Sequence, residues 1–304
     1  MPRIDFSRAD LHMHSTWSDG TDSPKDLLAK VTAAGIDFFS ITDHDEYRGS
    51  RLLLLQLKES WNETQDESLP FFIPGTEFSC RDDLGKYHIL GYAYQTDSVP
   101  IRKLMADLHD IRMLKVTNRL KYLKDKYGFG FSNEEIKRLM RHHNPGKPHI
   151  AKLMMKHGFA DSVSEAITKY INHYHGPERR IAPEEAIQAI LEAGGIPVLA
   201  HGPFGDGEQD LDAAEMETRV SRLIRAGLQG VEGYYSGYSP VHQQMMLEIA
   251  SRHDLLVTAG SDYHGKNKKV LLGDTGPSDN EEKKARLLPF YQEALTKVEQ
   301  YSQL

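Results

Sequence analysis

The segment Asp10-Leu11-His12-Met13-His14-Ser15 places two histidines in alternate positions, and Asp19 follows a few residues later. The residues from Arg8 to His14 predict a first strand. Alternate side chains of a strand point to the same face, so both imidazoles can face one point in space. The residues from Trp17 to Asp22 are typical of a loop, which can bring Asp19 back over the strand end. Two imidazoles and a carboxylate suit a divalent transition metal. The His-x-His pair alone leaves a polar strand end without a metal equally open.

The residues that follow predict a helix and then a second strand. Ser23 and Pro24 open the helix, because serine is a good N-cap and proline fits the first helical position. Gly35 ends it, as glycine commonly does. An apolar strand at 38–42 then runs into Asp43-His44-Asp45. Polar residues at the carboxyl ends of strands that alternate with helices are typical of α/β barrels, whose chemistry lies at that end.

The rest of the chain resumes this alternation after one interruption. Further strands are predicted at 71–79, 87–92, 196–200, 230–234 and 255–260. The region from 101 to 181 differs, because its apolar residues recur at helical spacing and no strand pattern is present. Ser132 and Ser162 each precede a glutamate by three residues, as in the capping boxes that open helices. We therefore expect an α/β barrel at 1–100 and 182–280, an inserted small all-helical domain at 101–181, and a C-terminal helix at 281–304 that packs on the barrel.

Ligand-type side chains stand at the predicted strand ends or in the loops beside them. They are His12, His14, Asp19, His44, Glu77, His88, His201, Asp262 and His264. A single histidine at a strand end is more often a hydrogen-bonded core residue, but nine such residues at corresponding positions are hard to explain by chance. Imidazoles with carboxylates suit Mn²⁺, Fe²⁺ or Zn²⁺ and not an oxygen-only Ca²⁺ site. Their number exceeds the needs of one ion and suits two or three ions with open positions for substrate.

Composition narrows the class of protein. The chain has 304 residues, of which 39% are hydrophobic, and a formal net charge of -7, which argues against a stable nucleic-acid complex. Its longest apolar runs are shorter than the roughly 20 residues of a membrane span, and we expect no signal peptide. The one cysteine, Cys80, excludes an internal disulfide and favours a reducing cytoplasm. The motifs of a phosphate-binding loop and of a nucleophile elbow are missing.

Taken together, these motifs resemble those of the PHP family, the polymerase and histidinol phosphatase domain. The segment from Asp10 to Asp19 is similar to the first motif of that family and Thr42-Asp43-His44-Asp45 to the second. The third and fourth motifs correspond to Ala200-His201 and to Gly260-Ser261-Asp262-Tyr263-His264, and Gly75-Thr76-Glu77 and His88-Ile89-Leu90-Gly91 match the positions between. The resemblance extends from about residue 8 to about residue 272. It implies a distorted (β/α)₇ barrel with a trinuclear metal site.

The resemblance also implies a grouping of the ligands. One ion would be held by His12, His14, Glu77 and Asp262. Glu77 would bridge to a second ion held with His88 and His201, and the third would be held by Asp19, His44 and His264. A metal-bound hydroxide held by Glu77, His88 and His201 would attack phosphorus, because bound metals lower the pKa of water. Asp10 and Asp43 are expected to orient ligand imidazoles; plain strand-end hydrogen bonding is the alternative.

The helical insertion is similar to that of stand-alone PHP phosphoesterases, which include 3′,5′-nucleoside bisphosphate phosphatases and 5′→3′ exonucleases of short RNA. We therefore expect a small phosphorylated substrate, a nucleoside 3′,5′-bisphosphate whose 3′-phosphate is hydrolysed to leave a nucleoside 5′-monophosphate. Three alternatives stay open: an exonuclease of short RNA, a histidinol-phosphate phosphatase, and a metal-binding regulatory module without turnover.

Cations in the insertion are candidates for substrate binding. Arg112, Lys115 and Arg119 recur at helical spacing and share one face of a helix, and His149 is a further candidate by resemblance. Such donors suit a phosphate, so we expect the insertion to cap the barrel mouth and hold the second phosphate or the base. A solvated surface stripe is the alternative. Two departures from the family pattern bear on substrate choice: Gly202 follows His201 where proline is usual, and Lys115 and Asn118 stand where arginines are common.

Overall fold

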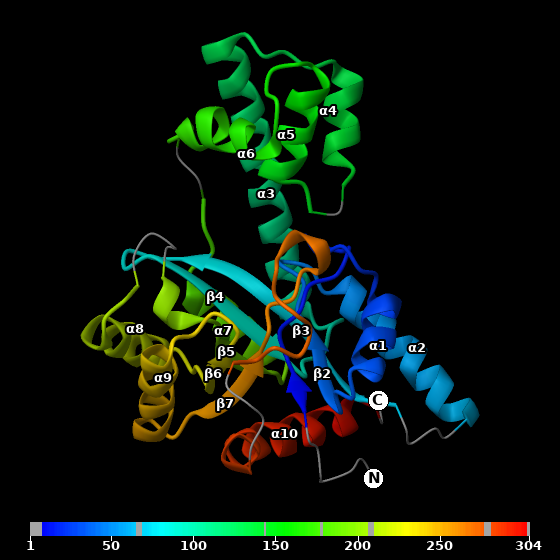
Figure 1. Cartoon of the computed structure of the whole chain (residues 1–304), viewed down its shortest axis with the longest axis vertical. Coiled ribbons are helices and arrows are strands. Elements are labelled where there is room, and N and C mark those ends of the chain that lie inside the picture. The colour runs from blue at the N-terminus through cyan, green and yellow to red at the C-terminus, as the bar shows by residue number, and fades with distance from the viewer. Residues whose placement is uncertain are drawn as a thin grey trace. The chain divides into compact units, whose positions relative to one another are not determined.

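The computed structural model describes residues 8–64, 69–142, 144–176, 179–205, 210–276 and 281–302. They form two compact units, whose course along the chain can be followed by colour in Figure 1. The larger unit contains the described residues up to Leu104 and those from Ile181 onward, and the smaller unit is Met105–Arg180.

The larger unit is built on a seven-stranded sheet in which the strands neighbour one another in chain order. The strands are β1 Ala9–Asp10, β2 Phe38–Ile41, β3 Phe71–Arg81, β4 Lys86–Tyr92, β5 Ile196–Leu199, β6 Gly230–Tyr235 and β7 Leu256–Gly260. β1, β2 and β3 pair in parallel, and so do β5, β6 and β7, whereas β4 is antiparallel to both of its neighbours. The predicted α/β fold is therefore confirmed, and the reversed β4 is the main distortion of the barrel.

The sheet approaches closure through the residues that follow β1. The amide of Leu11 donates to the carbonyl of Ala259 over 2.8 Å, and the amide of His14 donates to the carbonyl of Tyr263 over 2.8 Å. The strand expected up to His14 is wrong in its length, since β1 ends at Asp10. The reason is that the chain beyond β1 makes isolated hydrogen bonds to the end of β7 and to the residues that follow it, in place of a regular ladder.

The hairpin of β3 and β4 explains where His88 lies. Asp82 shapes its turn by accepting hydrogen bonds from the amides of Leu84 and Gly85, at 2.8 and 3.1 Å. The expectation that His88 ends a strand is wrong, because His88 stands near the start of β4. Since β4 runs antiparallel, its start lies at the edge where the parallel strands end, so His88 still reaches the same edge.

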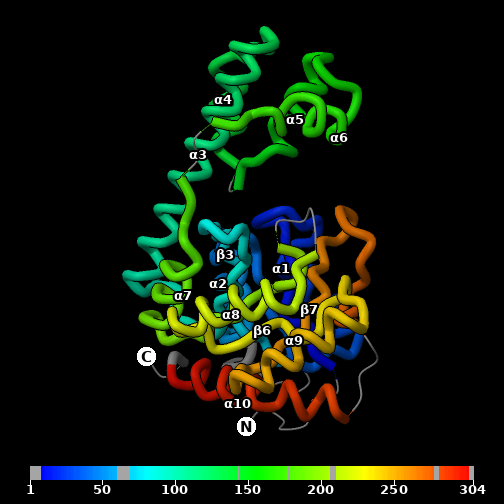
Figure 2. The backbone as a smooth tube through the Cα atoms, turned by 90° about the vertical axis from the view of Figure 1, so that its left-hand side faces the viewer, coloured from blue at the N-terminus to red at the C-terminus, as the bar shows by residue number. Residues whose placement is uncertain are grey.

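Helices surround the sheet, as Figure 2 shows. They are α1 Pro24–Ala33, α2 Arg48–Thr64, α7 Pro183–Glu192, α8 Ala213–Arg225 and α9 Pro240–Arg252, with short 3-10 turns at η3 Gly202–Phe204 and η4 Gly265–Asn267. The predicted start of α1 is confirmed: Ser23 Oγ accepts a hydrogen bond from the amide of Asp26 over 3.2 Å. Gly35 follows the helix with a φ of 64°, which glycine adopts without strain. Among the described residues, no helix combines the length and apolar character needed to cross a membrane.

The last helix, α10 Glu281–Ser302, packs on one end of the barrel. Its Tyr291 ring lies 4.8 Å from the ring of Phe38 and 5.8 Å from that of Phe71, the first residues of β2 and β3. Its Phe290 ring lies 5.1 Å from that of Tyr92, the last residue of the antiparallel β4. Because all three partners mark the end where the parallel strands begin, α10 leaves the opposite end, which carries the polar residues, to the site.

The smaller unit is helical. Its elements are the greater part of α3 Val99–Tyr127, α4 Asn133–Met140, α5 Lys147–Lys156, α6 Val163–Glu165, a π-helix η1 Ala166–Tyr170 and a 3-10 turn η2 Ile171–His173. Leu123, Ile150 and Met154 are buried in its core. The capping box predicted at Ser132 is confirmed. In the box predicted at Ser162, the hydrogen bond expected from the glutamate side chain is wrong. The Glu165 carboxylate accepts a hydrogen bond from the amide of Asp161, the residue before Ser162, over 2.8 Å.

Candidate metal centre

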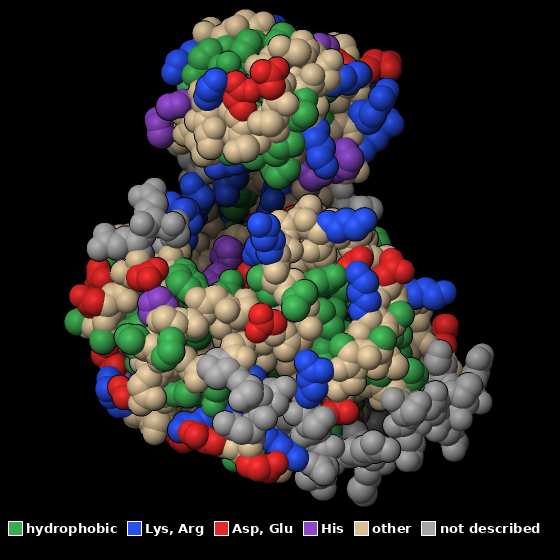
Figure 3. Space-filling model, in the orientation of Figure 1, with side chains coloured by type: hydrophobic (Ala, Val, Ile, Leu, Met, Phe, Trp, Pro, Cys, Tyr) green, Lys and Arg blue, Asp and Glu red, His purple; other side chains and the backbone are tan. Residues whose placement is uncertain are grey.

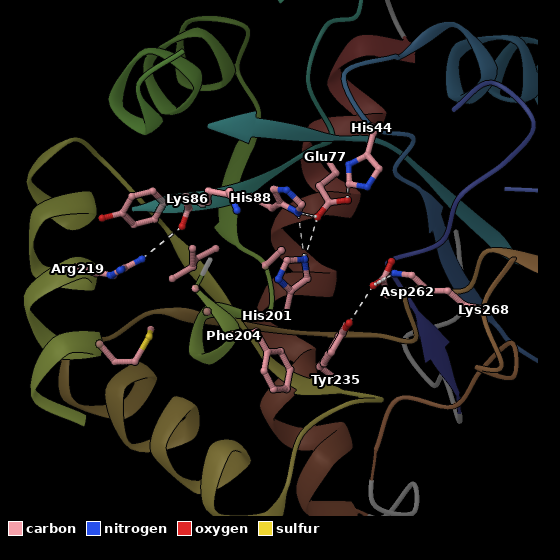
Figure 4. Close-up of a pocket in the computed structure, with 16 residues that line it drawn as sticks. His44, Glu77, Lys86, His88, His201, Phe204, Arg219, Tyr235, Asp262 and Lys268 are labelled. Atoms are coloured by element: carbon pink, nitrogen blue, oxygen red, sulfur yellow. Dashed lines mark hydrogen bonds and ion pairs between the residues drawn. The ribbon is translucent and has the colours of Figure 1, made fainter. Parts of the chain in front are cut away.

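Glu77 lies in the middle of the cluster of predicted ligands, and its side chain is fully buried. Its Oε1 lies 2.7 Å from His88 Nδ1 and 3.0 Å from His201 Nε2. These two nitrogens lie 3.3 Å from each other, and Figure 4 shows the three side chains converging from β3, β4 and the end of β5. His201 adopts φ 27° and ψ 44°, close to the left-handed region, which costs a residue with a side chain about 1–2 kcal/mol.

The other oxygen of Glu77 faces the histidines of the first motif. Oε2 lies 3.2 Å from Nε2 of both His12 and His14. Asp262 Oδ1 approaches the same two nitrogens at 3.7 and 3.2 Å. The φ of Asp262 is 58°, a conformation that Asp adopts more readily than most residues, and its amide donates to the carbonyl of His12 over 2.7 Å. The two oxygens of Glu77 therefore face two separate sets of side chains.

Asp19, His44 and His264 lie on a third side of the cluster. Asp19 Oδ1 lies 3.3 Å from His264 Nε2 and 3.7 Å from His14 Nδ1. The His14 ring lies 4.0 Å from that of His264 and 4.5 Å from that of His44, centroid to centroid. His44 Nδ1 also reaches Glu77 Oε2 at 3.0 Å. The structure thus brings all nine predicted ligands into one continuous cluster, while their division among three ions stays a prediction.

The donor atoms fit divalent metal ions. His12 Nε2, His14 Nε2 and Glu77 Oε2 are buried, and among the described residues these atoms have no hydrogen-bond partner. A buried polar atom without a partner is costly, so three of them turned toward one another call for an ion that all can bind. Three sets have ligand atoms within 4.8 Å of one another: His14, Asp19, His44 and His264; His12, His14 and Glu77; His44, Glu77 and His88.

Burial and charge set the protonation of the cluster. Burial lowers the pKa of His14, but the carboxylates of Asp262 and Glu77 outweigh it and raise that pKa to about 9. Burial also lowers the pKa of His44, to about 3, although Glu77 opposes this. Burial raises the pKa of Glu77, yet the neighbouring histidines lower it well below its usual value overall. A metal ion must therefore displace a proton from His14, whereas His44 already offers a lone pair at neutral pH.

Asp10 and Asp43 contact serines and backbone amides beside the cluster. The Asp10 carboxylate accepts the amide and hydroxyl of Ser261 over 2.9 and 2.6 Å. The Asp43 carboxylate accepts the hydroxyl of Ser18 over 2.6 Å, and Ser18 Oγ lies 3.5 Å from His14 Nδ1. Neither acid touches an imidazole nitrogen directly in the described structure, because serine hydroxyls and backbone amides occupy their oxygens. Ser18 thus links Asp43 to the His14 ring, and the expectation that Asp10 and Asp43 orient ligand imidazoles stays a prediction.

A pocket of about 390 Å³ borders the cluster within the larger unit and contains residues that sequence analysis does not select. They include Lys86, Phe204, Arg219, Tyr235 and Lys268, all labelled in Figure 4. The Tyr235 hydroxyl donates to Asp262 Oδ2 over 2.8 Å, and Lys268 Nζ lies 2.6 Å from the same oxygen. Figure 3 shows histidine side chains at the bottom of a hollow in this unit. Two of these residues could have been found from their positions in the sequence, because Tyr235 ends β6 and Lys268 closely follows the predicted ligand His264.

Glu232 is a further residue to which sequence analysis assigns no role. It lies on β6, the one core strand without a predicted ligand, and it is fully buried. Its carboxyl oxygens contact the His12 ring and the His201 amide. A lone acid within an apolar strand is the signal that could reveal it.

The predicted substrate-binding residues lie in the smaller unit. Arg112, Lys115 and Arg119 are on α3 and His149 is on α5, all partly exposed. Burial, together with nearby cations that include Arg112, lowers the pKa of His149 to about 4, so these two residues are neighbours. The amide of Gly146 donates to His149 Nδ1 over 3.3 Å, which leaves Nε2 of the neutral ring as a hydrogen-bond donor. Their binding of a phosphate stays a prediction.

Comparison with known proteins identifies relatives along most of the chain. The phosphoribosyl 1,2-cyclic phosphate 1,2-diphosphodiesterase of Eggerthella lenta is 25% identical over 86% of this chain and 95% of its own length. The 5′-3′ exoribonuclease Rnm of Salmonella typhimurium is 25% identical over 87% of each chain. The 3′,5′-nucleoside bisphosphate phosphatase of Chromobacterium violaceum is 23% identical over 85% of this chain and 88% of its own length.

A similar solved structure and a matching protein family point to the same group of proteins as these relatives. A Bifidobacterium adolescentis protein, described as a metal-dependent phosphoesterase, has a similar structure with a TM-score of 0.72 and 28% identity. That match covers 92% of this chain and 95% of the other. The PHP domain family matches residues 10–206, a range that includes the predicted ligands from His12 to His201. The chain therefore belongs to the PHP domain family and is a metal-dependent phosphoesterase.

Proposed function

We propose that the enzyme hydrolyses a phosphomonoester of a small nucleotide, namely the 3′-phosphate of a nucleoside 3′,5′-bisphosphate such as pAp. The product would be a nucleoside 5′-monophosphate. The observation that carries the reaction class is Glu77, whose two oxygens face separate sets of imidazoles at 2.7–3.2 Å. Two cations held on the two sides of Glu77 would suit a phosphoryl group, which offers several oxygens and develops charge during transfer. The bisphosphate phosphatase of Chromobacterium violaceum supports the finer choice of substrate.

The chemistry that bound Mn²⁺, Fe²⁺ or Zn²⁺ ions would supply is a lowered pKa of water and neutralisation of phosphate oxygens. The chain's own residues position these components. The burial of Glu77 keeps bulk water from the centre, which strengthens each electrostatic contact. Tyr235 and Lys268 hold the outer oxygen of Asp262, so that its inner oxygen stays directed at His14.

The pocket beside the cluster supports a substrate with a flat aromatic base. The ring of Tyr235 lies 5.4 Å from that of His201, and the ring of Phe204 lies 5.8 Å from that of Tyr235. Leu199 and Met216 add apolar surface to the same pocket. Rings and aliphatic side chains of this kind bind a nucleobase by stacking and burial of apolar area.

A substrate panel tests the proposal. Phosphate or nucleotide release is measured with Mn²⁺ on a nucleoside 3′,5′-bisphosphate, a short 5′-phosphorylated RNA, histidinol phosphate and phosphoribosyl 1,2-cyclic phosphate. We expect the highest kcat/KM on the bisphosphate. A higher value on short RNA or on the cyclic phosphate would assign the activity of the Salmonella or the Eggerthella relative instead. Turnover of none of the four would favour a regulatory metal-binding module.

Arg119 is proposed to bind a part of the substrate other than the scissile phosphate. Arg119→Ala should then lower kcat/KM for the bisphosphate by roughly one to two tenfold steps, since a lost charge-assisted contact is worth ~1.5–3 kcal/mol. It should leave hydrolysis of p-nitrophenyl phosphate nearly unchanged, because that ester lacks the second phosphate.

Lys121→Ala is the matched control for this variant. Lys121 lies on the same helix, is exposed, and pairs with Asp125, so it should affect neither substrate. Equal losses of Arg119→Ala on both esters would place Arg119 at the reaction centre or in the fold. No loss on either ester would leave Arg119 as part of a solvated surface stripe.

The proposal includes a cytoplasmic location. It rests on Cys80, which is a buried free thiol and so fits a reducing compartment.

A further inference from the structure

Glu232 lies between two ligands that belong to different sides of the cluster. Its Oε1 lies 3.1 Å from His12 Nδ1, and its Oε2 accepts the backbone amide of His201 over 2.8 Å. Both Glu232 and His12 are fully buried, so water cannot substitute for either contact. Since His12 and His201 face opposite oxygens of Glu77, one carboxyl group on β6 touches both sets.

The contact with His12 decides which of its ring nitrogens can bind a metal. A carboxylate has no proton to donate, so the hydrogen of this bond must be on His12 Nδ1. The lone pair of the neutral ring is then on Nε2, the nitrogen that faces Glu77 and Asp262 at 3.2 and 3.7 Å. Carboxylates that accept a hydrogen bond from the far nitrogen of a ligand histidine fix its tautomer and its ring orientation.

The contact with His201 holds a strained backbone. With φ 27° and ψ 44°, His201 occupies a conformation that residues with a side chain rarely adopt. This conformation directs the imidazole toward Glu77 and His88. Strain of this kind persists only where surrounding contacts hold it, and the Glu232 carboxyl is the side-chain group that binds this amide in the described structure.

The surrounding strands leave room for Glu232 in two ways. In the pairing of β6 with β7, Glu232 aligns with Thr258 and Tyr234 with Ala259, so Gly233 is an extra residue that forms a bulge next to Glu232. Such bulges change the direction of a neighbouring side chain. On β7, a Cβ at Gly260 would lie 2.3 Å from Glu232 Oε1 and 2.3 Å from His12 Cβ. Any larger residue at position 260 would therefore push the pair apart.

We propose that Glu232 is the positioning residue of the metal centre, which fixes the ring of His12 and the backbone of His201 together and thereby couples the two sides of the cluster. Glu232 is fully buried and is not among the residues that line the pocket. It acts through the geometry of its two ligand partners, and its loss should weaken metal binding before it changes the fold.

Glu232→Gln tests the proposal with a change of almost no volume. The amide has one acceptor oxygen and one NH₂ donor. If its oxygen accepts the His201 amide, its NH₂ faces His12 Nδ1 and favours the tautomer with the proton on Nε2, which removes the lone pair that a metal needs. Equilibrium dialysis against Mn²⁺ with elemental analysis should show an affinity about 10–100-fold lower than that of the natural protein for at least one ion. No substrate enters this assay, so its result does not depend on which phosphoester the enzyme hydrolyses.

Glu46→Gln is the matched control. Glu46 is also a buried acid near the same edge, but its carboxylate accepts hydrogen bonds from Arg48, at 2.8 Å from the amide and 2.9 Å from Nε. This variant should lose some stability and keep the Mn²⁺ affinity of the natural protein. The unfolding temperature, measured after chelation and again with Mn²⁺, separates the two roles. A positioning role predicts a smaller rise with Mn²⁺ for Glu232→Gln than for Glu46→Gln.

Two results would overturn the role of Glu232 alone. One is an unchanged Mn²⁺ affinity in Glu232→Gln, and the other is a Gln variant that fails to fold even with Mn²⁺ present, which would make Glu232 a residue of the barrel wall. A natural protein that binds no Mn²⁺ would overturn the metal centre together with this role.

Discussion

Replacing His44 or Asp262 by alanine should remove nearly all phosphoester hydrolysis while the fold stays in place. His44 Nδ1 lies 3.0 Å from Glu77 Oε2, and Asp262 Oδ1 lies 3.2 Å from His14 Nε2, so each belongs to the cluster on which metal binding depends. Loss of a ligand disturbs the ions that activate water, and that effect should cost at least several tenfold steps in rate. The barrel itself should survive, because neither side chain belongs to the apolar core formed by residues such as Leu27, Phe39 and Ile41.

Phosphate release and circular dichroism, measured together, decide this prediction. The control is His253→Ala. His253 is a partly exposed histidine that pairs with Glu217, so this variant should keep full activity. Asp262→Asn is a useful second variant, because the φ of 58° at this position suits Asn better than Ala. Retention of more than about a tenth of the activity in His44→Ala would contradict its role as a ligand.

Removal of metal should abolish activity completely, and Mn²⁺ should restore it. The cluster joins six imidazoles to the carboxylates of Asp19, Glu77 and Asp262, and its buried atoms His12 Nε2, His14 Nε2 and Glu77 Oε2 have no hydrogen-bond partner in the described structure. We therefore expect two or three equivalents of transition metal in protein purified without chelator. Chelation should also lower the unfolding temperature, because ions that bind only the folded state stabilise it by mass action.

Elemental analysis before chelation and after reconstitution with Mn²⁺ gives the stoichiometry, and the same samples are assayed for phosphate release. A mock-dialysed sample without chelator controls for losses in handling. Less than one equivalent after reconstitution would exclude the trinuclear arrangement. Full activity in a sample shown to be metal-free would contradict metal dependence itself.

The local sequence was enough to indicate where the cluster would form. Each of the useful patterns extends over only a few residues. They are the alternation of His12 and His14, the helix start at Ser23, and the strand that ends before His44. Side-chain periodicity and capping preferences act between residues that are close in sequence, so these patterns can be recognised in the sequence alone. The same reasoning predicted the alternation of strands and helices, and with it the edge at which polar residues collect.

Only the tertiary structure decided how these residues work together. The reversed direction of β4 brings His88 to the site from the start of its strand, and nothing in residues 86–92 alone specifies that direction. Asp10 and Asp43 act through serines and backbone amides, which no spacing rule could anticipate. Glu232 reaches His12 across 220 positions of sequence, through a bulge in β6 and past a glycine in β7. Such contacts depend on strand order and register across the whole barrel, so they form only when the barrel has folded. The ligands, in contrast, can be recognised from short sequence motifs.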